Sequence, residues 1–592
     1  MKLQNLIPIF LLFSSPIFSQ KYDFKWIMGY SSADNPLDTG WGCSFMDFNT
    51  QDGNPIFYES KYKRIDFLAN TSNICDENGK YLFSFNGAYV EGPNDSLMEN
   101  ADQLTDEPSQ KYPSFGTGSF QGTLILPFPG HKNQYLAFNK ITFYFENFGL
   151  SDKYLEYSIV DMSANQGNGK MLKRRIKILQ DTLDDTSLSA IKHANGRDWW
   201  LLCCKDTRLE YFVFLISPKG VELKHRFDFP KLKSRGEAGQ NVFSNDGSIF
   251  ASARADRLKA FYYLNWFNFD RCSGVLSNYL NIKLPFQIDQ WYAGAMFSKN
   301  DSYFYYACLD TLYQFDVING LPQNRKVVDY YDGFQEDLGR NFVGITQFGS
   351  LSQAPDGKAY MHTIVGFRSL HTLHDPNHAT PLCNFKQHDI FCPTMKISIP
   401  VFPNFRLGPI DGSSCDTLGI DNVPWCHWRY NQDTSNHLQF YFKDLSAYNV
   451  ENWYWDFGDP ASISNTSTEL NPTHKFTSNG IYNVCLIVKN QFGADTLCRS
   501  IQIGTVDSKN PGSVTINTWP NPCKDFLVVN ILDYNPQNSF LEIYDLNGRL
   551  ILKQKVYQGS NFIQTSELLP GYHILCIKEV GLILITTQIL KF

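Results

Sequence analysis

The sequence predicts an all-β protein with about three domains, since a chain of 592 residues is too long for one hydrophobic core. Aromatic residues make up 15% of the chain, with 47 Phe and 32 Tyr, and such side chains fit the half-buried face of a sheet. Polar turns that alternate with short aromatic runs point the same way. The formal net charge of −7 gives no basic surface of the kind that nucleic-acid-binding proteins carry, so we expect no nucleic-acid partner.

The first residues have the composition of a secretory signal. Met1-Lys2 gives a positive start, and an apolar stretch from Leu6 to Phe18 precedes Ser19-Gln20. This stretch is too short for a good membrane span, and no later segment is long and apolar enough for one. We therefore expect residues 1–19 to be a signal peptide that directs export to the periplasm.

A polar turn followed by an aromatic-rich strand recurs through residues 20–407. Asn-Gly and Asp-Gly turns between apolar runs are strong hairpin signals, because these residues tolerate positive φ. The six turns are Glu77–Gly79, His131–Asn133, Asn195–Gly196, Asn245–Gly247, Lys299–Asp301 and Pro355–Gly357. Their spacing of roughly 56 residues is typical of β-propeller blades. We expect six or seven blades, with Cys43–Phe48 pairing with the last blade to close the ring; a set of stacked sandwiches is the alternative.

Residues 20–407 also resemble a known region. They are similar to the N-terminal propeller of large secreted proteins from bacteria that use type IX secretion and gliding. The residues that carry the resemblance are Met46–Phe48, Ser119–Gly122, Leu126–Gly130, Gln353–Lys358, Cys383–His388 and Pro403–Gly408. This resemblance implies a propeller and no particular chemistry.

Three motifs occur in order within residues 430–504: Trp455–Asp459, Asn471–Phe476 and Gly480–Val484. They resemble the signature of a PKD domain, a small Ig-like β-sandwich that serves as a spacer and interaction module. Pro460 stands where the family has Gly, so we expect a different turn there. The segment before this domain, residues 408–429, has the Gly, Pro and Ser composition of a linker.

Two aspartates of the first motif are candidate metal ligands. Asp456 and Asp459 could hold a Ca²⁺ ion, because hard cations favour clustered oxygen ligands. The alternative is that both carboxylates accept hydrogen bonds from N–H groups of the turn. We expect no other cofactor.

Export makes disulfides permissible among the 14 Cys. Cys485 and Cys498 are equally far from the turn at Asn490–Gly493, so they should lie opposite each other in an antiparallel hairpin. Two weaker pairings are Cys415 with Cys426, and Cys383 with Cys392.

Residues 511–592 resemble the type A sorting domain of type IX secretion. Pro520–Pro522, Asp545–Arg549 and Pro570–Tyr572 follow the order of that family. The resemblance implies a small β-sandwich that is recognised by the secretion machinery and cleaved after translocation. It also implies that the rest of the chain is released or attached to surface lipopolysaccharide.

No convincing catalytic set is present in the sequence. G-x-S-x-G, H-E-x-x-H, P-loop and G-x-G-x-x-G motifs are missing. His371, His374 and His378 have metal-like spacing, but Asp375–Asn377 would break a helix, so we expect a solvated loop. The remaining candidates are carboxylate pairs and sugar-stacking tryptophans, namely Asp184-Asp185, Glu336-Asp337, Trp199, Trp200, Trp266 and Trp291; we expect polar loops and core packing for them.

We therefore expect a secreted or cell-surface, non-enzymatic binding or adhesion protein. Its propeller would present a ligand-binding face for a polysaccharide or surface protein, and the PKD domain would act as a spacer. An extracellular enzyme that degrades polysaccharide or protein on the propeller is one alternative. A structural subunit of a surface or gliding assembly is another.

Overall fold

The computed structural model describes most of the chain. The described residues are 20–30, 42–60, 62–67, 70–105, 116–117, 121–145, 149–184, 186–205, 210–229, 238–256, 261–285, 292–337, 343–364, 367–396, 398–504, 516–531, 539–545, 549–557, 559–566, 568–579 and 582–591. The predicted signal peptide, residues 1–19, lies outside them. Within them the chain is built from strands and one 3₁₀ turn at Asn165–Gly167. In these ranges we find no helix long and apolar enough to cross a bilayer.

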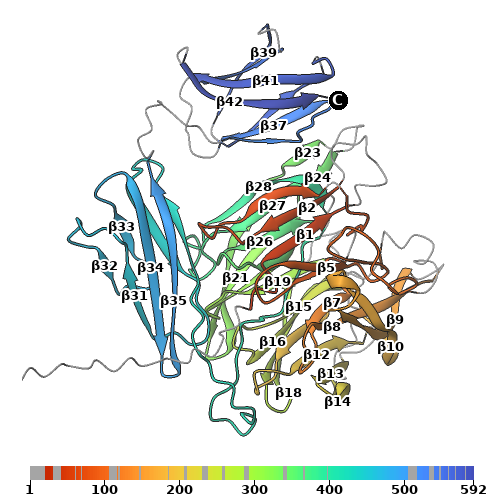
Figure 1. Cartoon of the computed structure of the whole chain (residues 1–592). Coiled ribbons are helices and arrows are strands. Elements are labelled where there is room, and N and C mark those ends of the chain that lie inside the picture. Colours follow the sequence, from red (N-terminus) through yellow and green to blue (C-terminus); the bar gives the residue numbers. More distant parts are fainter. Residues whose placement is uncertain are drawn as a thin grey trace, which may run out of the picture.

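The N-terminal region consists of successive antiparallel sheets (Figure 1). The first two sheets have three strands each: β1 (Lys25–Gly29), β2 (Cys43–Asp47) and β3 (Ile56–Ser60), then β4 (Ser72–Cys75), β5 (Tyr81–Phe85) and β6 (Val90–Glu91). The next two have four each: β7 (Thr123–Pro127), β8 (Gln134–Phe145), β9 (Gly149–Asp161) and β10 (Lys170–Leu183), then β11 (Ser189–Lys192), β12 (Trp199–Cys204), β13 (Glu210–Ser217) and β14 (Gly220–Asp228).

An eight-stranded sheet follows and divides into two four-stranded units. The first unit contains β15 (Gly239–Phe243), β16 (Ile249–Asp256), β17 (Phe261–Asp270) and β18 (Val275–Pro285). The second contains β19 (Ala293–Phe297), β20 (Tyr303–Cys308), β21 (Thr311–Ile318) and β22 (Leu321–Tyr330). A parallel bridge between Gly239 and Ala293 joins the two units, and the Gln240 side chain accepts from Ala295 N–H at 3.0 Å across the same boundary. The last sheet contains β25 (Phe348–Gln353), β26 (Ala359–Thr363), β27 (Phe367–Leu373) and β28 (Phe385–Lys396), and it is preceded by a hairpin of β23 (Gln335–Asp337) and β24 (Val343–Ile345).

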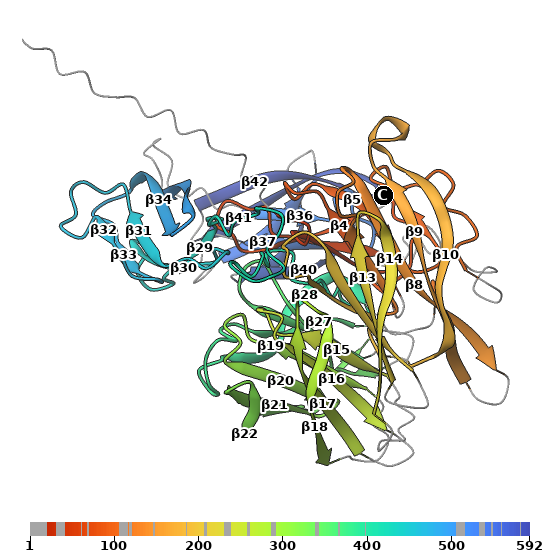
Figure 2. The same cartoon turned by 90° about the horizontal axis from the view of Figure 1, so that it is seen from below.

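The first strands of neighbouring sheets lie next to one another. The Asn73 amide of β4 bonds to the backbone of β1, accepting from Ile27 N–H at 3.2 Å and donating to Lys25 O at 2.7 Å. Ser72 Oγ donates to Thr123 O of β7 at 3.0 Å. With its successive small sheets arranged around these first strands, the N-terminal region fits a propeller-like fold (Figures 1 and 2).

The prediction for Cys43–Phe48 is wrong in one respect. This segment forms β2, the central strand of the first sheet, rather than a strand of the last one. It contacts the last sheet through Ser44, whose hydroxyl lies 2.7 Å from the Thr394 hydroxyl and accepts from Thr394 N–H at 3.1 Å. Both edges of β2 are already paired, with β1 and β3, so it cannot also pair with a strand of the last sheet.

The six predicted turns are confirmed. Each joins the first strand of a sheet to the second strand of the same sheet, from the sheet of β4 to the sheet of β25. Each also places one residue at positive φ, between 55° and 86°: Gly79, Asn133, Gly196, Gly247, Asp301 and Gly357. Side chains other than Asn and Asp rarely adopt this conformation, which explains the Asn-Gly and Asp-Gly sequence pattern.

Two small sandwiches follow. The PKD-like region contains β29 (Trp428–Gln432), β30 (Gln439–Asp444) and β33 (Thr473–Lys475) in one sheet, and β32 (Thr466–Ser467), β31 (Asn452–Asp456), β34 (Gly480–Asn490) and β35 (Gly493–Ile503) in the other. The C-terminal region contains β36 (Ile516–Trp519), β37 (Phe526–Ile531) and β40 (Gly559–Gln564) in one sheet, and β39 (Leu550–Lys555), β38 (Ser539–Tyr544), β41 (Gly571–Glu579) and β42 (Leu582–Lys591) in the other.

Alternation of apolar and polar residues determines which face of each PKD-like strand is buried. Along β34, Val484, Leu486 and Val488 are buried and belong to the sandwich core, whereas the residues between them are partly or fully exposed. Successive side chains of a strand point to opposite faces, so this pattern leaves one side of the sheet in solvent. Cys485 and Cys498 form a disulfide on that solvent side, directly opposite each other in the hairpin.

Candidate functional site

The PKD-like region is docked on the propeller-like region through a shared hydrophobic cluster. Trp425, next to the first PKD-like strand, is 4% exposed and packs in one cluster with Phe24 and Trp26. The Phe24 and Trp425 rings meet edge to face at 6.1 Å, and Trp425 stacks on His427 at 5.0 Å. Burial of these large rings stabilises the contact between the two regions.

Backbone carbonyl groups accept most of the polar contacts across this junction. Arg429 Nε donates to Asp356 O at 2.7 Å, and Arg499 Nη1 donates to Gln51 O at 2.8 Å. Tyr430 N–H donates to Asp52 O at 3.0 Å. The acceptors Gln51, Asp52 and Asp356 all lie in turns of the propeller-like sheets, so the PKD-like region covers the face on which those turns lie.

The segment predicted as a linker, residues 408–429, lies against the propeller-like region. Ile410 N–H donates to Ala194 O at 2.9 Å, and Cys415 forms a disulfide with Cys272, with 5.7 Å between the Cα atoms. The expected pairings of Cys415 with Cys426 and of Cys383 with Cys392 are therefore wrong. Cys426 is buried in the PKD-like core, while Cys383 and Cys392 are buried in different clusters, and none of the three belongs to either disulfide of the described residues.

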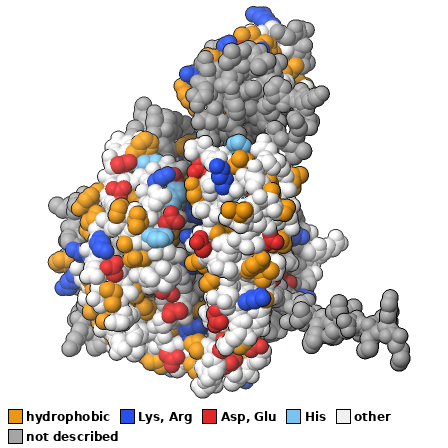
Figure 3. All heavy atoms as spheres, turned by 90° about the vertical axis from the view of Figure 1, so that its left-hand side faces the viewer, with side chains coloured by type: hydrophobic (Ala, Val, Ile, Leu, Met, Phe, Trp, Pro, Cys, Tyr) orange, Lys and Arg blue, Asp and Glu red, His pale blue; other side chains and the backbone are white. Residues whose placement is uncertain are grey.

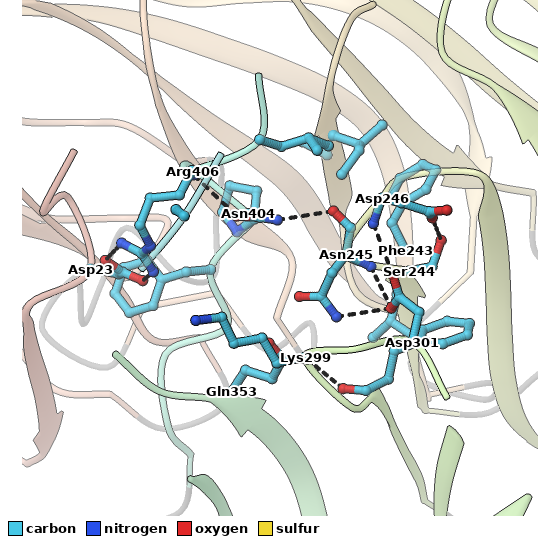
Figure 4. Close-up of a pocket in the computed structure, with 18 of the residues that line it drawn as sticks. Asp23, Phe243, Ser244, Asn245, Asp246, Lys299, Asp301, Gln353, Asn404 and Arg406 are labelled. Atoms are coloured by element: carbon cyan, nitrogen blue, oxygen red, sulfur yellow. Dashed lines mark hydrogen bonds and ion pairs between the residues drawn. The ribbon is translucent and has the colours of Figure 1, made fainter. Parts of the chain in front are cut away.

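A cavity of about 840 Å³ lies at this junction (Figure 4). Its wall comes from the turns after β15, β19 and β25, from residues 401–411, and from residues 445–449 of the PKD-like region. The rings of Phe24, Phe402, Trp425 and Tyr448 line it together with the amides of Asn245, Gln353 and Asn404. Its size falls in the range of roughly 300–1,000 Å³ that is usual for small-molecule sites.

The carboxylates that line the cavity are all engaged in bonds within the protein. Asp23 forms a bidentate ion pair with Arg406, with distances of 2.5 and 2.6 Å. Asp301 accepts from the backbone N–H of Asn245 at 2.7 Å and of Asp246 at 3.0 Å, and burial raises the pKa of Asp301 to about 6. The other three accept bonds from nearby groups: Asp246 from Ser244 and Ser248, Asp270 from Cys272 and Ser273, and Asp411 from Asn422.

Two further cations line the cavity, Arg271 and Lys299, and their hydrogen bonds go to backbone carbonyls rather than to carboxylates. Arg271 is 4% exposed and donates to Lys192 O at 2.9 Å and to Gly408 O at 2.5 Å. Lys299 Nζ donates to the carbonyls of Leu445 at 3.1 Å and Ser446 at 3.4 Å. Figure 4 shows Lys299 between the Asp23–Arg406 pair and the group formed by Asn245 and Asp301.

Sequence reasoning missed this cavity. Lys299 lies in one of the predicted turns, and Arg406 lies in the Pro403–Gly408 motif, so both segments were noticed for other reasons. Their meeting depends on docking of residues 445–449, which are distant in the sequence. No local pattern marks such a contact.

The predicted calcium ligands both accept hydrogen bonds from other residues of the PKD-like region. Asp456 accepts from Gly458 N–H at 2.9 Å and from the Asn465 amide at 3.1 Å. Asp459, 1% exposed, accepts from the backbone N–H and the hydroxyl of Thr477 at 2.9 and 2.7 Å. The lone pairs that a Ca²⁺ ion would need are thus directed toward N–H and O–H donors.

The histidine segment is not a solvated loop throughout. His371 lies in β27 and is fully buried, with Nε2 3.0 Å from Thr346 O and Nδ1 accepting from His388 N–H at 3.2 Å. Burial lowers the pKa of His371 to about 3, so this ring is neutral. His374 instead pairs with Asp389 at 2.9 Å. Among the described residues, no three His, Cys, Asp or Glu side chains gather as a metal site would require.

The other candidates pack in the interior. Trp199, Trp200 and Trp266 are at most 2% exposed, as core packing predicts, and Trp291 lies outside the described residues. Asp184 is not in a solvated loop but forms a buried ion pair with Arg254; Asp185 is outside the described residues. Glu336 and Asp337 lie in β23 and do not line the cavity.

The outer surface offers no comparable site on the side where the PKD-like region lies. Figure 3 shows hydrophobic, acidic and basic side chains interspersed over that side. A patch of one charge sign or one large apolar patch would mark a recognition surface. On this side of the molecule, the cavity is therefore a better candidate for a binding site than the exposed surface.

Two family models match the chain. Residues 429–504 match the PKD domain, and residues 517–591 match the secretion system C-terminal sorting domain. Both predicted assignments are thereby confirmed. No curated protein matches this chain.

Solved structures give only distant likenesses. The PKD1 domain of a Vibrio cholerae metalloprotease is 29% identical over 14% of this chain and 99% of that domain, with a TM-score of 0.12. A proposed 6-phosphogluconolactonase from Bacteroides uniformis is 10% identical over 73% of this chain and all of its own, with a TM-score of 0.27. A prolyl endopeptidase is 10% identical over 88% of this chain and 55% of its own, with a TM-score of 0.28. Because all three TM-scores are below 0.5, no argument on activity rests on them.

The two matched domains settle where the protein acts. A type IX sorting domain directs a chain out of the cell, and the described residues contain no membrane-spanning helix. The chain is therefore an exported protein, secreted or displayed on the cell surface, that carries a PKD domain at residues 429–504 and a type IX secretion sorting domain at residues 517–591.

Proposed function

We propose that this exported protein is a non-enzymatic binding or adhesion protein. The propeller-like region and the PKD domain together would hold the ligand, and the sorting domain would deliver them to the surface. The observation that carries the proposal is the state of the cavity carboxylates. Each one accepts hydrogen bonds within the protein, and Asp23 is held in a bidentate pair with Arg406, which favours a role in holding the cavity wall over one in polymer hydrolysis.

Docking of the PKD domain changes the role that its family resemblance implies. A spacer keeps two partners apart, whereas this domain contributes Ala447, Tyr448 and the carbonyls of Leu445 and Ser446 to the junction. We infer that the PKD domain supports and completes the ligand site.

The test uses the chain from Gln20 to Phe592, applied to a glycan array, to insoluble polysaccharides and to surface extracts, with product analysis on every hit. We expect retention on a polysaccharide with no released oligosaccharide. Released product would overturn the proposal in favour of a polymer-degrading enzyme. Stable capture into one large complex without any glycan binding would overturn it in favour of a structural subunit of a surface assembly.

A further inference from the structure

The side chain of Lys299 stands in the junction cavity without a carboxylate partner. Among the described residues, none of the ion pairs shorter than 4.0 Å includes its Nζ atom, and its two hydrogen bonds go to the carbonyls of Leu445 and Ser446. An ammonium group has three N–H donors, so one remains for another acceptor. The side chain is accessible to solvent, as expected for a group that stands in a hollow.

The charges around Lys299 favour an anion beside it. Desolvation of its ammonium group, opposed by Asp444 and reinforced by the nearby cations Arg406 and Lys443, lowers the pKa of Lys299 to about 8. Arg406 and Lys443 each have a carboxylate partner, in Asp23 and Asp375. Lys299 has none, so an incoming anion would meet an uncompensated positive charge in a partly desolvated site.

The rest of the wall suits a sugar. The Gln353 and Asn404 amides each donate one N–H to a backbone carbonyl, of Phe297 and Asn245, and the second N–H of each is a donor that a sugar hydroxyl can use. Trp425 and Tyr448 supply rings to the wall. Tyr448 lines the cavity, and in the described part of the chain its buried hydroxyl has no hydrogen-bond partner.

We propose that the junction cavity binds an acidic sugar, with Lys299 pairing with the sugar carboxylate. The inference deepens the proposed binding function and rests on it. Two carbonyls of the PKD domain hold the lysine that pairs with the ligand, so the site is complete only when the PKD domain is docked.

The experiment compares two matched probes by calorimetry on the chain from Gln20 to Phe592. One probe is a β-1,4-linked glucose tetramer, and the other is the same tetramer oxidised to glucuronate. We expect the acidic tetramer to bind at least about tenfold more tightly, because hydrogen bonds to charged groups contribute about 1.5–3 kcal/mol. Lys299→Met should abolish this preference and Lys299→Arg should retain it. Lys326→Met, a change of an exposed lysine on β22, is the matched control and should leave it unchanged.

Two further readouts make the test specific. Affinity of the unmodified protein for the acidic tetramer should fall as pH rises through about 8, where Lys299 loses its charge, and Lys299→Arg should remove this fall. Inorganic phosphate serves as a competitor; displacement of the acidic tetramer at equal concentration would overturn the assignment to a sugar.

Failure of this inference differs from failure of the proposed function. If both tetramers bind equally, or if Lys299→Met keeps the preference, the acidic-sugar site is wrong while binding itself stands. If the acidic tetramer is cleaved, the non-enzymatic function is wrong even where Lys299 is needed. Thermal melting of each variant shows whether a loss of binding comes from unfolding, and a variant that melts as the unmodified protein does makes the comparison valid.

Discussion

The PKD domain and the sorting domain are β-sandwiches of similar size, yet they are attached in different ways. The PKD domain shares a hydrophobic cluster with the propeller-like region, through its own Ala447 and Tyr448 and through Trp425 in the segment just before it. The core of the sorting domain draws only on its own strands, with Leu527, Leu541 and Ile577 fully buried in it. The difference indicates that the PKD domain is part of the working body of the protein, whereas the sorting domain is an address that can be removed without disturbing it.

The largest effects are expected when each of the two domains is deleted in turn. Removing residues 511–592 should abolish surface display and leave thermal melting of the remaining chain unchanged, because the core of the sorting domain is its own. Removing residues 429–504 should instead lower the melting temperature of the propeller-like region, since the cluster around Phe24 and Trp26 loses Ala447 and Tyr448. Surface labelling and calorimetry measure the two effects. Unchanged display after the first deletion would contradict the export role.

The two disulfides provide a second comparison, between a long-range crosslink and a local one. Cys272 and Cys415 are 143 residues apart and clamp the segment before the PKD domain, whereas Cys485 and Cys498 are 13 apart within one hairpin. Loop-closure entropy predicts a loss of about 5 kcal/mol for Cys272→Ser with Cys415→Ser, against about 3 kcal/mol for Cys485→Ser with Cys498→Ser. Urea unfolding of both double variants under oxidising conditions checks the order. A larger loss in the hairpin variant would show that the long-range clamp does little for stability.

How far the sequence predicts each part depends on the range of the interactions involved. The PKD and sorting motifs are local, and the propeller-like turns mark themselves because positive φ restricts the residue choice at Gly79 or Asn133. The pairing of Cys485 with Cys498 could be predicted for the same reason, because both residues lie in one hairpin. The Cys272–Cys415 pair and the contact of Lys299 with Leu445 join residues more than 140 positions apart. No local pattern reveals such contacts, so the composition of residues 408–429 suggested a linker although the segment is packed against the propeller-like region.

A substitution at the junction should have a somewhat smaller effect. Trp425→Ala removes a ring that is 4% exposed and should cost about 3–5 kcal/mol, in line with large-to-small changes in cores. Tyr454→Ala, at a ring of the PKD domain that is 44% exposed, is the control and should change stability by no more than about 0.5 kcal/mol. Denaturant titration of the two variants gives both values. Equal effects would mean that the junction contributes no more than the surface.

The smallest expected effect concerns pH. His427 is 4% exposed, and burial together with Arg499, Lys21, Arg406 and Lys299 lowers its pKa well below the usual value. The unfolded chain takes up a proton there near pH 6.5 and the folded chain does not, so this part of the stability is present above pH 6.5 and decreases as pH falls. The slope should be about 1.4 kcal/mol per pH unit below 6.5.

The comparison with His427→Gln isolates that effect. The variant should lose this part of the pH dependence, while buried His362 and His371 contribute equally to both proteins. Unfolding free energies measured between pH 7.5 and 5 provide the check. Parallel curves for the two proteins would show that His427 is protonated in the folded state.

The Cys272–Cys415 bond has a consequence for life outside the cell, where proteases are present. Every peptide bond between the two cysteines lies inside a covalent ring. A single cut anywhere in that stretch opens the ring without dividing the molecule, so the PKD domain stays joined to the sheets before Cys272. After one proteolytic cut in this stretch, the exported protein therefore remains a single covalently joined molecule.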